Sequence, residues 1–323
     1  MSDETPVKDD AYFDANRRYR ILGTLGAGNF GIVYKAYDEK WQEEVALKTS
    51  RDDSVEQQQW LKEEYRIQGD IVHPVFVQPD ELREDRGRFY FTMKLVEGAR
   101  PFTEYFRCRR SAATEGEDKL LKAICAAAAE LADGLQTIHS FGRFHGDIKP
   151  ENVLINASGE VALLDFGFMR STRDPHQNTP ARLIGTPTYL PPEQYEPNEV
   201  SAASDWYALG LMLYETICEE AAFKGDPLEV LIAKQMAVPK IADRAPTTPE
   251  DLANLVDSML DPDPANRPSA QSVSYVLHQN ANPSKAIQST DAWLSNEAYL
   301  DDAFIAREHE LAELAHGFEQ ASE

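Results

Sequence analysis

Basic residues are scarce in this sequence. Its 323 residues include 32 lysines and arginines against 55 aspartates and glutamates, so the formal net charge is −23. A protein that binds nucleic acids through their phosphates needs a positively charged face, and this composition argues against that class of partner. The excess of acidic groups favours solubility; attraction of basic protein substrates is the alternative explanation.

Cysteines and long apolar runs are scarce as well. Cys108, Cys125 and Cys218 are odd in number, and their spacing matches neither a zinc site nor a disulfide framework. We therefore expect free thiols in a reducing cytoplasm. The longest apolar stretch, residues 120–135, is interrupted by charged residues, and the acidic N-terminus shows no signal-peptide pattern. The sequence predicts a cytoplasmic protein without a membrane span.

The remaining pattern divides the chain into four parts. Residues 1–16 are acidic and polar and predict a disordered leader. In residues 17–98, β-rich runs surround one helix for which Ser54 is the expected N-cap, a pattern typical of a small antiparallel sheet. Apolar residues recur at helical spacing through most of residues 99–280, and residues 281–323 begin with a linker-like segment. We predict an α+β fold with two lobes.

A glycine-rich stretch lies near the start of the predicted sheet. Gly26, Gly28 and Gly31 form a G-x-G-x-x-G pattern, and Val33 follows two residues later. Glycines allow a backbone to approach phosphates without side-chain collisions. A dinucleotide-binding turn would open a helix, whereas a second strand follows here. The pattern favours a flap between two strands that covers nucleotide phosphates.

The strand after this flap carries a lysine. Alternate residues of a strand share a face, so Lys48 and Ala46 of "VALK" face the glycine flap together. A charge in that position needs partners of opposite sign, which a phosphate and a carboxylate would supply. The following helix offers Glu63 and Glu64 as the carboxylate.

These stretches belong to an ordered series of motifs. The series is "LGAGNFGIV", "VALK", "HGDIKPEN", "DFG" and "PPE", and over residues 19–280 it resembles the eukaryotic-type (Hanks-type) serine/threonine protein kinases. The resemblance implies a small β-rich N-lobe and a larger, mostly helical C-lobe. It also implies transfer of the γ-phosphoryl group of ATP to Ser and Thr hydroxyls of proteins, autophosphorylation included.

The resemblance assigns roles to four residues of the two central motifs. Asp147 would accept the proton of the attacking hydroxyl or orient it, and Lys149 would neutralise the transferred phosphate. Asn152 and Asp165 would hold Mg²⁺, which prefers oxygen ligands. The Asp-x-Lys spacing resembles that of Ser/Thr kinases more than that of Tyr kinases.

The nucleotide pocket follows in the same way. Glu64 lies ten residues before Pro74, the usual spacing in the family, so it is preferred to Glu63 as the partner of Lys48. The resemblance places the hinge at "MKLVEG", with backbone groups of Lys94 and Val96 meeting the adenine edge. The further pocket residues are Met93 as gatekeeper, with Ala46 and Leu154 on the two faces of the ring.

Three further matches concern the architecture around the peptide site. Glu193 of "PPE" would form a buried ion pair with Arg267, and Asp205 would hydrogen-bond the catalytic-loop backbone. Tyr189 and Leu190 would shape the pocket beside the phosphoacceptor. This segment favours a protein substrate over a small molecule.

One position departs from the family. Gly146 stands where the H-R-D motif has an arginine that helps to bind a phosphate on the activation loop. We expect less dependence on loop phosphorylation, for which Ser171, Thr172 and Thr179 are candidate sites. The retained catalytic and magnesium-binding residues favour an active enzyme. The alternative is an ATP-binding pseudokinase that regulates an attached or partner domain.

The C-terminal segment has two interpretations. "DDAFIAREHELAELAHGFEQ" is similar to the opening that precedes the P-loop of STAND-type signalling ATPases, although Ala306 replaces the usual glycine. On this interpretation the chain is the front part of a larger bacterial signalling protein. The alternative is a terminal helix that docks on its own domain.

Overall fold

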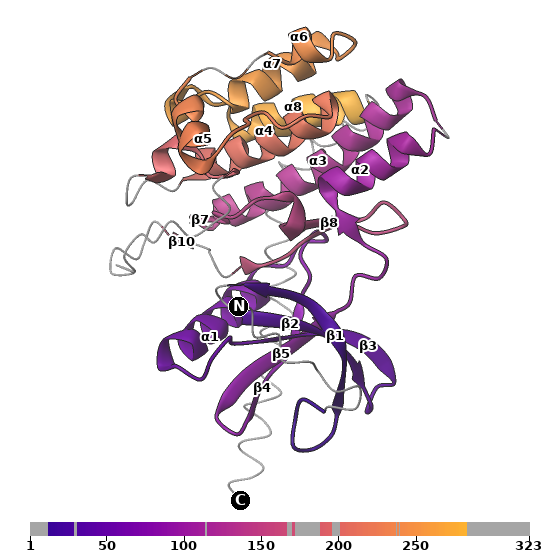
Figure 1. The fold of residues 1–323 in the computed structure, drawn as a ribbon, viewed down its shortest axis with the longest axis vertical. Coiled ribbons are helices and arrows are strands. Elements are labelled where there is room, and N and C mark those ends of the chain that lie inside the picture. The colour runs from indigo at the N-terminus through magenta and orange to yellow at the C-terminus, as the bar shows by residue number, and fades with distance from the viewer. Residues whose placement is uncertain are drawn as a thin grey trace, which may run out of the picture.

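The computed structural model contains a β-rich lobe and a helical lobe that meet along short strands (Figure 1). The two lobes correspond to the predicted α+β, bilobal class of fold. The predicted leader up to residue 11, the tail from residue 283, and Thr172 and Thr179 lie outside the described residues. The described residues are 12–28, 31–113, 115–166, 170–171, 188–195, 201–236, 238 and 240–282.

A five-stranded antiparallel sheet forms the first lobe. The register places Lys48 opposite Val33 on one neighbouring strand and opposite Phe91 on the other. The lysine therefore lies on a central strand, paired on both sides. In spatial order the strands are β1 (Tyr19–Gly28), β2 (Gly31–Asp38), β3 (Glu43–Thr49), β5 (Arg88–Lys94) and β4 (Pro79–Asp85).

The two faces of β3 contact different parts of the core. Val45 and Leu47 pack with Tyr19 in a cluster on one face of the sheet. Ala46 packs with Met93 in a second cluster, which faces the helical lobe. This alternation is the one expected of a strand with both faces covered, and it confirms that Ala46 and Lys48 share the inner face.

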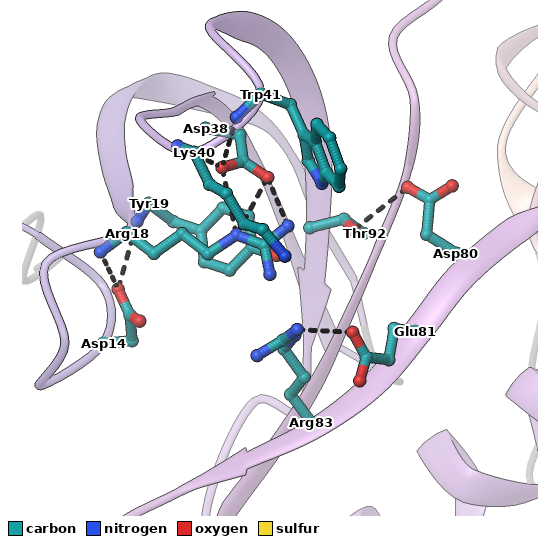
Figure 2. Close-up of polar contacts among 10 residues, drawn as sticks. All are labelled: Asp14, Arg18, Tyr19, Asp38, Lys40, Trp41, Asp80, Glu81, Arg83 and Thr92. Carbon is teal, nitrogen blue, oxygen red and sulfur yellow. Dashed lines mark hydrogen bonds and ion pairs between the residues drawn. The ribbon is translucent and has the colours of Figure 1, made fainter.

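Polar contacts fix the chain where it enters the sheet (Figure 2). Asp14 accepts hydrogen bonds from the backbone N–H groups of Arg18 (2.9 Å) and Tyr19 (3.0 Å). The Arg18 guanidinium donates to both carboxylate oxygens of Asp38, and Asp38 also accepts from the backbone N–H of Lys40 at 2.8 Å. The ordered fold thus begins before residue 17, inside the segment that we assigned to the leader.

Helix α1 (Val55–Asp70) packs beside β4 and β5 and carries Glu64. Its N-cap is Ser54, as predicted, and the Ser54 hydroxyl accepts from the backbone N–H of Gln57 at 3.3 Å. Such a cap satisfies one of the N–H groups that a helix leaves unpaired at its start. The cap defines where the helix begins and so at which turn Glu64 faces the sheet.

The second lobe is built around α4, which is buried along nearly its whole length. A helix that is apolar on all sides belongs in a core, and here α2, α3, α6 and α7 contact it. Figure 1 shows α8 lying along α3. The helices are α2 (Phe102–Ser111), α3 (Glu117–Ser140), α4 (Ala202–Cys218), α5 (Pro227–Lys234), α6 (Ile241–Arg244), α7 (Glu250–Met259) and α8 (Ala270–Ala281).

Short strands between the lobes position the catalytic loop. The loop runs from β7 to β8 and contains the 3-10 turn η1 (Pro150–Asn152). A backbone hydrogen bond of 2.8 Å from Leu163 to Val75 ties β9 to the first lobe. The strands are β6 (Arg100–Pro101), β7 (Arg143–Phe144), β8 (Val153–Ile155), β9 (Val161–Leu163) and β10 (Arg170–Ser171).

In the part of the chain that the structure describes, no helix has both the length and the apolar character needed to cross a lipid bilayer.

Candidate active site

Asp205 of α4 holds the start of the catalytic loop. Its carboxylate accepts hydrogen bonds from the backbone N–H groups of His145 (2.9 Å) and Gly146 (2.8 Å), and it lies 2.8 Å from Nε2 of His139. Although burial acts to raise the pKa of Asp205, the hydrogen bond with His139 and the other contacts lower it below its usual value. A charged carboxylate on a rigid helix therefore fixes the loop backbone.

Gly146 has a backbone conformation that suits glycine. Its φ angle is 76°, in the left-handed region, where an L-residue with a Cβ is strained by roughly 1–2 kcal/mol. The replacement of the usual arginine therefore removes a charge and also places the most permissive residue at a left-handed position.

The Asp147 carboxylate is the centre of the catalytic loop. Its Oδ2 accepts hydrogen bonds from Nζ of Lys149 at 2.7 Å and from Nδ2 of Asn152 at 2.8 Å. Asp147 is buried, and burial raises its pKa above the usual value, with Lys149 acting in the opposite direction. The structure thus brings together three of the residues predicted from the "HGDIKPEN" motif.

Lys48 of β3 bridges the two lobes. Its ammonium contacts Glu64 of α1 and lies 2.9 Å from Oδ1 of Asp165, in the helical lobe. Burial acts to lower the pKa of Lys48, but the carboxylates of Asp165 and Glu64 outweigh it and raise the pKa. The lysine is therefore protonated and paired with Glu64, while Glu63 is exposed to solvent.

Asp165 and Phe166 lie in the segment after β9, directly behind Leu164. Asp165 has a φ angle of 62°, which few residues other than glycine adopt, and its side chain is 31% exposed. Phe166 packs edge-on against Phe76, with ring centroids 5.3 Å apart, and against His145 at 5.7 Å. This packing holds the Asp165 carboxylate toward Lys48.

The three glycines of the flap have different surroundings. A Cβ added at Gly26 or Gly28 would meet nothing within 4 Å, so both positions border open space. A Cβ at Gly31 would collide with the carbonyl oxygen of Thr49 on β3. Gly26 and Gly28 leave room for a ligand. Packing against Thr49 also requires glycine at position 31, which the sequence pattern did not reveal.

An apolar cluster lies between the flap and the catalytic loop. It contains Ala46, Met93 and Leu154 together with Val33 and Val96, all of which we predicted for the nucleotide pocket. The predicted hinge residue Lys94 ends β5, and its side chain is exposed. The cluster also contains residues that the sequence reasoning did not name, among them Ala162 of β9 and Leu164, which follows that strand.

Comparison with known sequences assigns the chain that carries this site to a family. Residues 19–277, more than half of the chain, match the protein kinase domain. The chain belongs to the protein kinase family. The predicted family and the predicted bilobal fold are both confirmed, and members of this family use ATP as the phosphoryl donor.

The kinase domain is similar to several curated bacterial proteins. It is 33% identical over 246 residues to the DNA damage-responsive serine/threonine-protein kinase RqkA of Deinococcus radiodurans, covering 74% of this chain and 36% of that protein. It is 30% identical over 236 residues to the probable serine/threonine-protein kinase pknA2 of Bifidobacterium longum, covering 70% and 30%. Against the probable serine/threonine-protein kinase PknB of Lactococcus lactis the values are 28% over 257 residues, covering 77% and 40%. The chain therefore spans less than half the length of these relatives.

A buried ion pair anchors the kinase segment that follows the activation loop. The Arg267 guanidinium binds Glu193 in a two-point contact, with distances of 2.6 and 2.7 Å. Glu193 lies in η3 (Pro192–Tyr195) and also accepts from the Ser204 hydroxyl of α4 at 3.0 Å. This is the pairing expected from the "PPE" motif, and it ties the segment to the core helix.

The kinase site also contains residues that the motifs did not indicate. His139 at the end of α3 contacts Asp205, and Glu215 of α4 accepts a hydrogen bond from the Tyr189 hydroxyl. Neither residue is part of a quoted motif. The available signal was weak: a histidine in the last turn of an apolar helix and a glutamate at the end of another.

Proposed function

We propose that this chain transfers the γ-phosphoryl group of ATP to serine and threonine hydroxyls of proteins. The observation that carries the proposal is the joint placement of two charge clusters: Lys48 with Glu64 and Asp165, and Asp147 with Lys149. One cluster suits the phosphates of a nucleotide, and the other suits an attacking hydroxyl. The names of the bacterial relatives support the same activity.

We assign the chemical step to the catalytic loop. The Asp147 carboxylate would orient the attacking hydroxyl and take up its proton, and a raised pKa favours that uptake. Lys149, 2.7 Å from Asp147, would then stabilise the negative charge that develops on the transferred group. Asn152 keeps the Asp147 side chain in place through its own hydrogen bond.

The residues present fit ATP and Mg²⁺. The open space at Gly26 and Gly28 suits phosphates, and the apolar cluster around Ala46 and Leu154 suits an adenine ring. Asn152 and Asp165 would supply oxygen ligands for Mg²⁺, which when bound neutralises charge on the phosphates. Within the described residues no group of three or more His, Cys, Asp or Glu side chains could hold a metal ion, so phosphate oxygens would complete the coordination.

The larger context of the domain is also a proposal. We retain the order of a leader, an N-lobe up to residue 98, a C-lobe over residues 99–280 and a following module that resembles the start of a STAND-type ATPase, with the N-lobe beginning before residue 17 because Asp14 contacts Arg18 and Tyr19. A cytoplasmic location agrees with the three cysteines, which are free thiols. We also retain the proposal that Gly146 reduces the dependence on activation-loop phosphorylation, because it offers no cation to a phosphate.

Phosphotransfer from labelled ATP tests the proposed function. The chain is incubated with ATP and Mg²⁺, alone and with histone H1 as a basic acceptor protein. We expect acid-stable label on Ser or Thr, and Asp147→Asn should lower the rate by about 10²–10⁴-fold. Lys48→Ala should abolish transfer because it removes the cation beside the phosphates. Lys35→Ala on the neighbouring strand is the matched control, since Lys35 forms a partly exposed ion pair with Glu44.

The outcomes separate the two candidate functions. Transfer by the unchanged chain and by Lys35→Ala, but not by the Asp147 and Lys48 variants, supports the kinase. ATP binding without any transfer would instead support the pseudokinase alternative, to which Gly146 is the sequence pointer. Near-normal transfer by Lys48→Ala would contradict our assignment of the site.

A further inference from the structure

Lys234, the last residue of α5, is buried in the helical lobe. Its exposed fraction is 1%, whereas lysines are almost never fully buried. Val230, four residues earlier and therefore on the same helix face, is buried as well. Lys234 thus occupies a position where the helix pattern calls for an apolar side chain, and its burial needs a physical reason.

The reason lies in the loop that follows the activation segment. The Lys234 ammonium donates hydrogen bonds to the backbone carbonyl of Thr188 at 2.6 Å and to that of Leu190 at 2.5 Å. Between them lies Tyr189, whose hydroxyl is bound by Glu215 of α4. Carbonyls outside helices and sheets require partners of this kind when they are buried. The loop is therefore held by its main chain and by the Tyr189 side chain at once.

Aromatic side chains surround the Lys234 ammonium. Nζ lies 5.7 Å from the ring centroid of Phe223 and 5.9 Å from that of Tyr207, distances suited to cation–π contacts. Burial lowers the pKa of Lys234 to about 7, although Glu215 and Glu193 act to raise it. A neutral amine keeps two N–H donors, so both carbonyls can be bound in either protonation state.

The loop that Lys234 holds lies beside the reacting groups. Tyr189 and Leu190 line the same cleft as Gly146 and Asp147. A main-chain shift of this loop would therefore move the surface that meets a protein substrate next to the attacking hydroxyl. Shifts of about 1 Å in such positions can cost on the order of 10²-fold in rate.

We propose that Lys234 is a positioning residue that fixes the Thr188–Leu190 loop for binding of the protein substrate. The inference rests on the proposed kinase function, because it concerns the acceptor side of the same site. It assigns the two anchors of the segment different tasks. Arg267 binds a side chain, Glu193, and secures the segment to the core, whereas Lys234 binds main-chain carbonyls and sets the position of the loop itself.

Steady-state kinetics with histone H1 as acceptor test this inference. Lys234→Met keeps the length and apolar stem of the side chain but removes every donor. We expect the KM for histone H1 to rise about tenfold through the loss of two hydrogen bonds. The KM for ATP and the slow hydrolysis of ATP without a protein acceptor should change less than twofold. Lys234→Gln, which retains an NH₂ donor, should raise the KM for histone H1 less than Lys234→Met does.

Two further variants make the test specific. Lys224→Met removes an exposed lysine of the same lobe, which pairs with Glu220, and should leave the KM for histone H1 unchanged. Tyr189→Phe removes the hydroxyl that binds Glu215 and so the contact that holds the loop through a side chain. Combined with Lys234→Met, it should raise the KM for histone H1 by less than the product of the single effects, because Lys234 and Tyr189 hold the same loop. If Lys234→Met does not fold, Tyr189→Phe and Lys234→Gln carry the same comparison.

Some results would overturn the inference. An unchanged KM for histone H1 in Lys234→Met would do so. Strictly multiplicative effects of Lys234→Met and Tyr189→Phe on that KM would do so as well. A parallel change in the KM for ATP, in ATP hydrolysis and in the melting temperature would assign Lys234 a purely structural role. If the unchanged chain transfers no phosphate to any acceptor, it is the proposed function that fails, and this inference falls with it.

Discussion

Lys48 in the β-rich lobe and Arg267 in the helical lobe are both buried cations that contact a glutamate. The partners of Lys48 lie on two lobes, and one of them, Asp165, is 31% exposed. The Arg267 guanidinium side chain is 0% exposed. Besides Glu193, it donates to the backbone carbonyls of Asp261 and Ala203, each at 2.9 Å.

The difference separates two uses of a buried ion pair. A guanidinium that directs its donors to partners within one lobe stabilises a fixed arrangement. An ammonium shared between two lobes has partners that move relative to one another when the lobes move, and a bound phosphate would compete for the same charge. We therefore expect Arg267 to matter mainly for stability and Lys48 mainly for activity.

The largest expected effect is on stability. Arg267→Met leaves the Glu193 carboxylate buried and unpaired by its cation, which should lower the free energy of unfolding by about 3–5 kcal/mol. Lys48→Met should cost less, because burial raises the pKa of Glu64 and that carboxyl can take up a proton. Urea denaturation of both variants measures the contrast. Equal losses would break the comparison between the lobes, and Arg267→Met with Glu193→Met should regain most of the loss.

A medium effect is expected at the catalytic loop of the helical lobe. Gly146→Ala places a Cβ at a φ of 76°, and we expect a loss of roughly 1–2 kcal/mol in the free energy of unfolding. Gly69→Ala in α1 of the β-rich lobe is the matched control, because a Cβ there meets nothing within 4 Å. That change should stabilise by about 0.4–1 kcal/mol. The same sign for both variants in denaturation experiments would show that Gly146 is not held in the left-handed region.

The smallest effect compares two helix caps. Ser54→Ala and Ser269→Ala each remove a hydroxyl that accepts from a helix N–H at 3.3 Å, so each should cost about 1 kcal/mol. Ser54 caps the helix that carries Glu64, whereas Ser269 caps α8, away from Lys48. Only Ser54→Ala should raise the KM for ATP. If both variants raise it, or neither does, the cap of α1 is not coupled to the Lys48–Glu64 pair.

Much of the fold could be predicted because its signals are local. The glycine flap is followed by a strand instead of a helix, and the alternation at Val45–Lys48 indicates two covered faces. The cap at Ser54 and the apolar period of the later helices are likewise contained within one or two turns of chain. The prediction of where the fold begins was less accurate, since Asp14 contacts Arg18 and Tyr19 from within a polar segment that lacks an apolar period.

The candidate site also contains residues linked by short spacing and residues that only the fold brings together. Asp147, Lys149 and Asn152 lie within six residues of one another, so their spacing alone indicates that they act together. The environment of Gly31 depends on the carbonyl of Thr49, which the sheet brings next to it. The contact between His139 and Asp205 joins residues of different helices. No spacing rule predicts contacts of this second kind.

The sequence by itself determined the kinase family, the order of the two lobes and the identity of the residues around Asp147, because these depend on residue types at short separations. Only the tertiary structure decided that the Thr49 carbonyl faces Gly31 and that Lys234 is buried. By sequence, a lysine in the last turn of a helix is expected to face water, where it complements the helix dipole. Packing of α5 into the core of the helical lobe turned that lysine toward Tyr207 of α4 and the Tyr189 loop, where two carbonyls accept its hydrogen bonds.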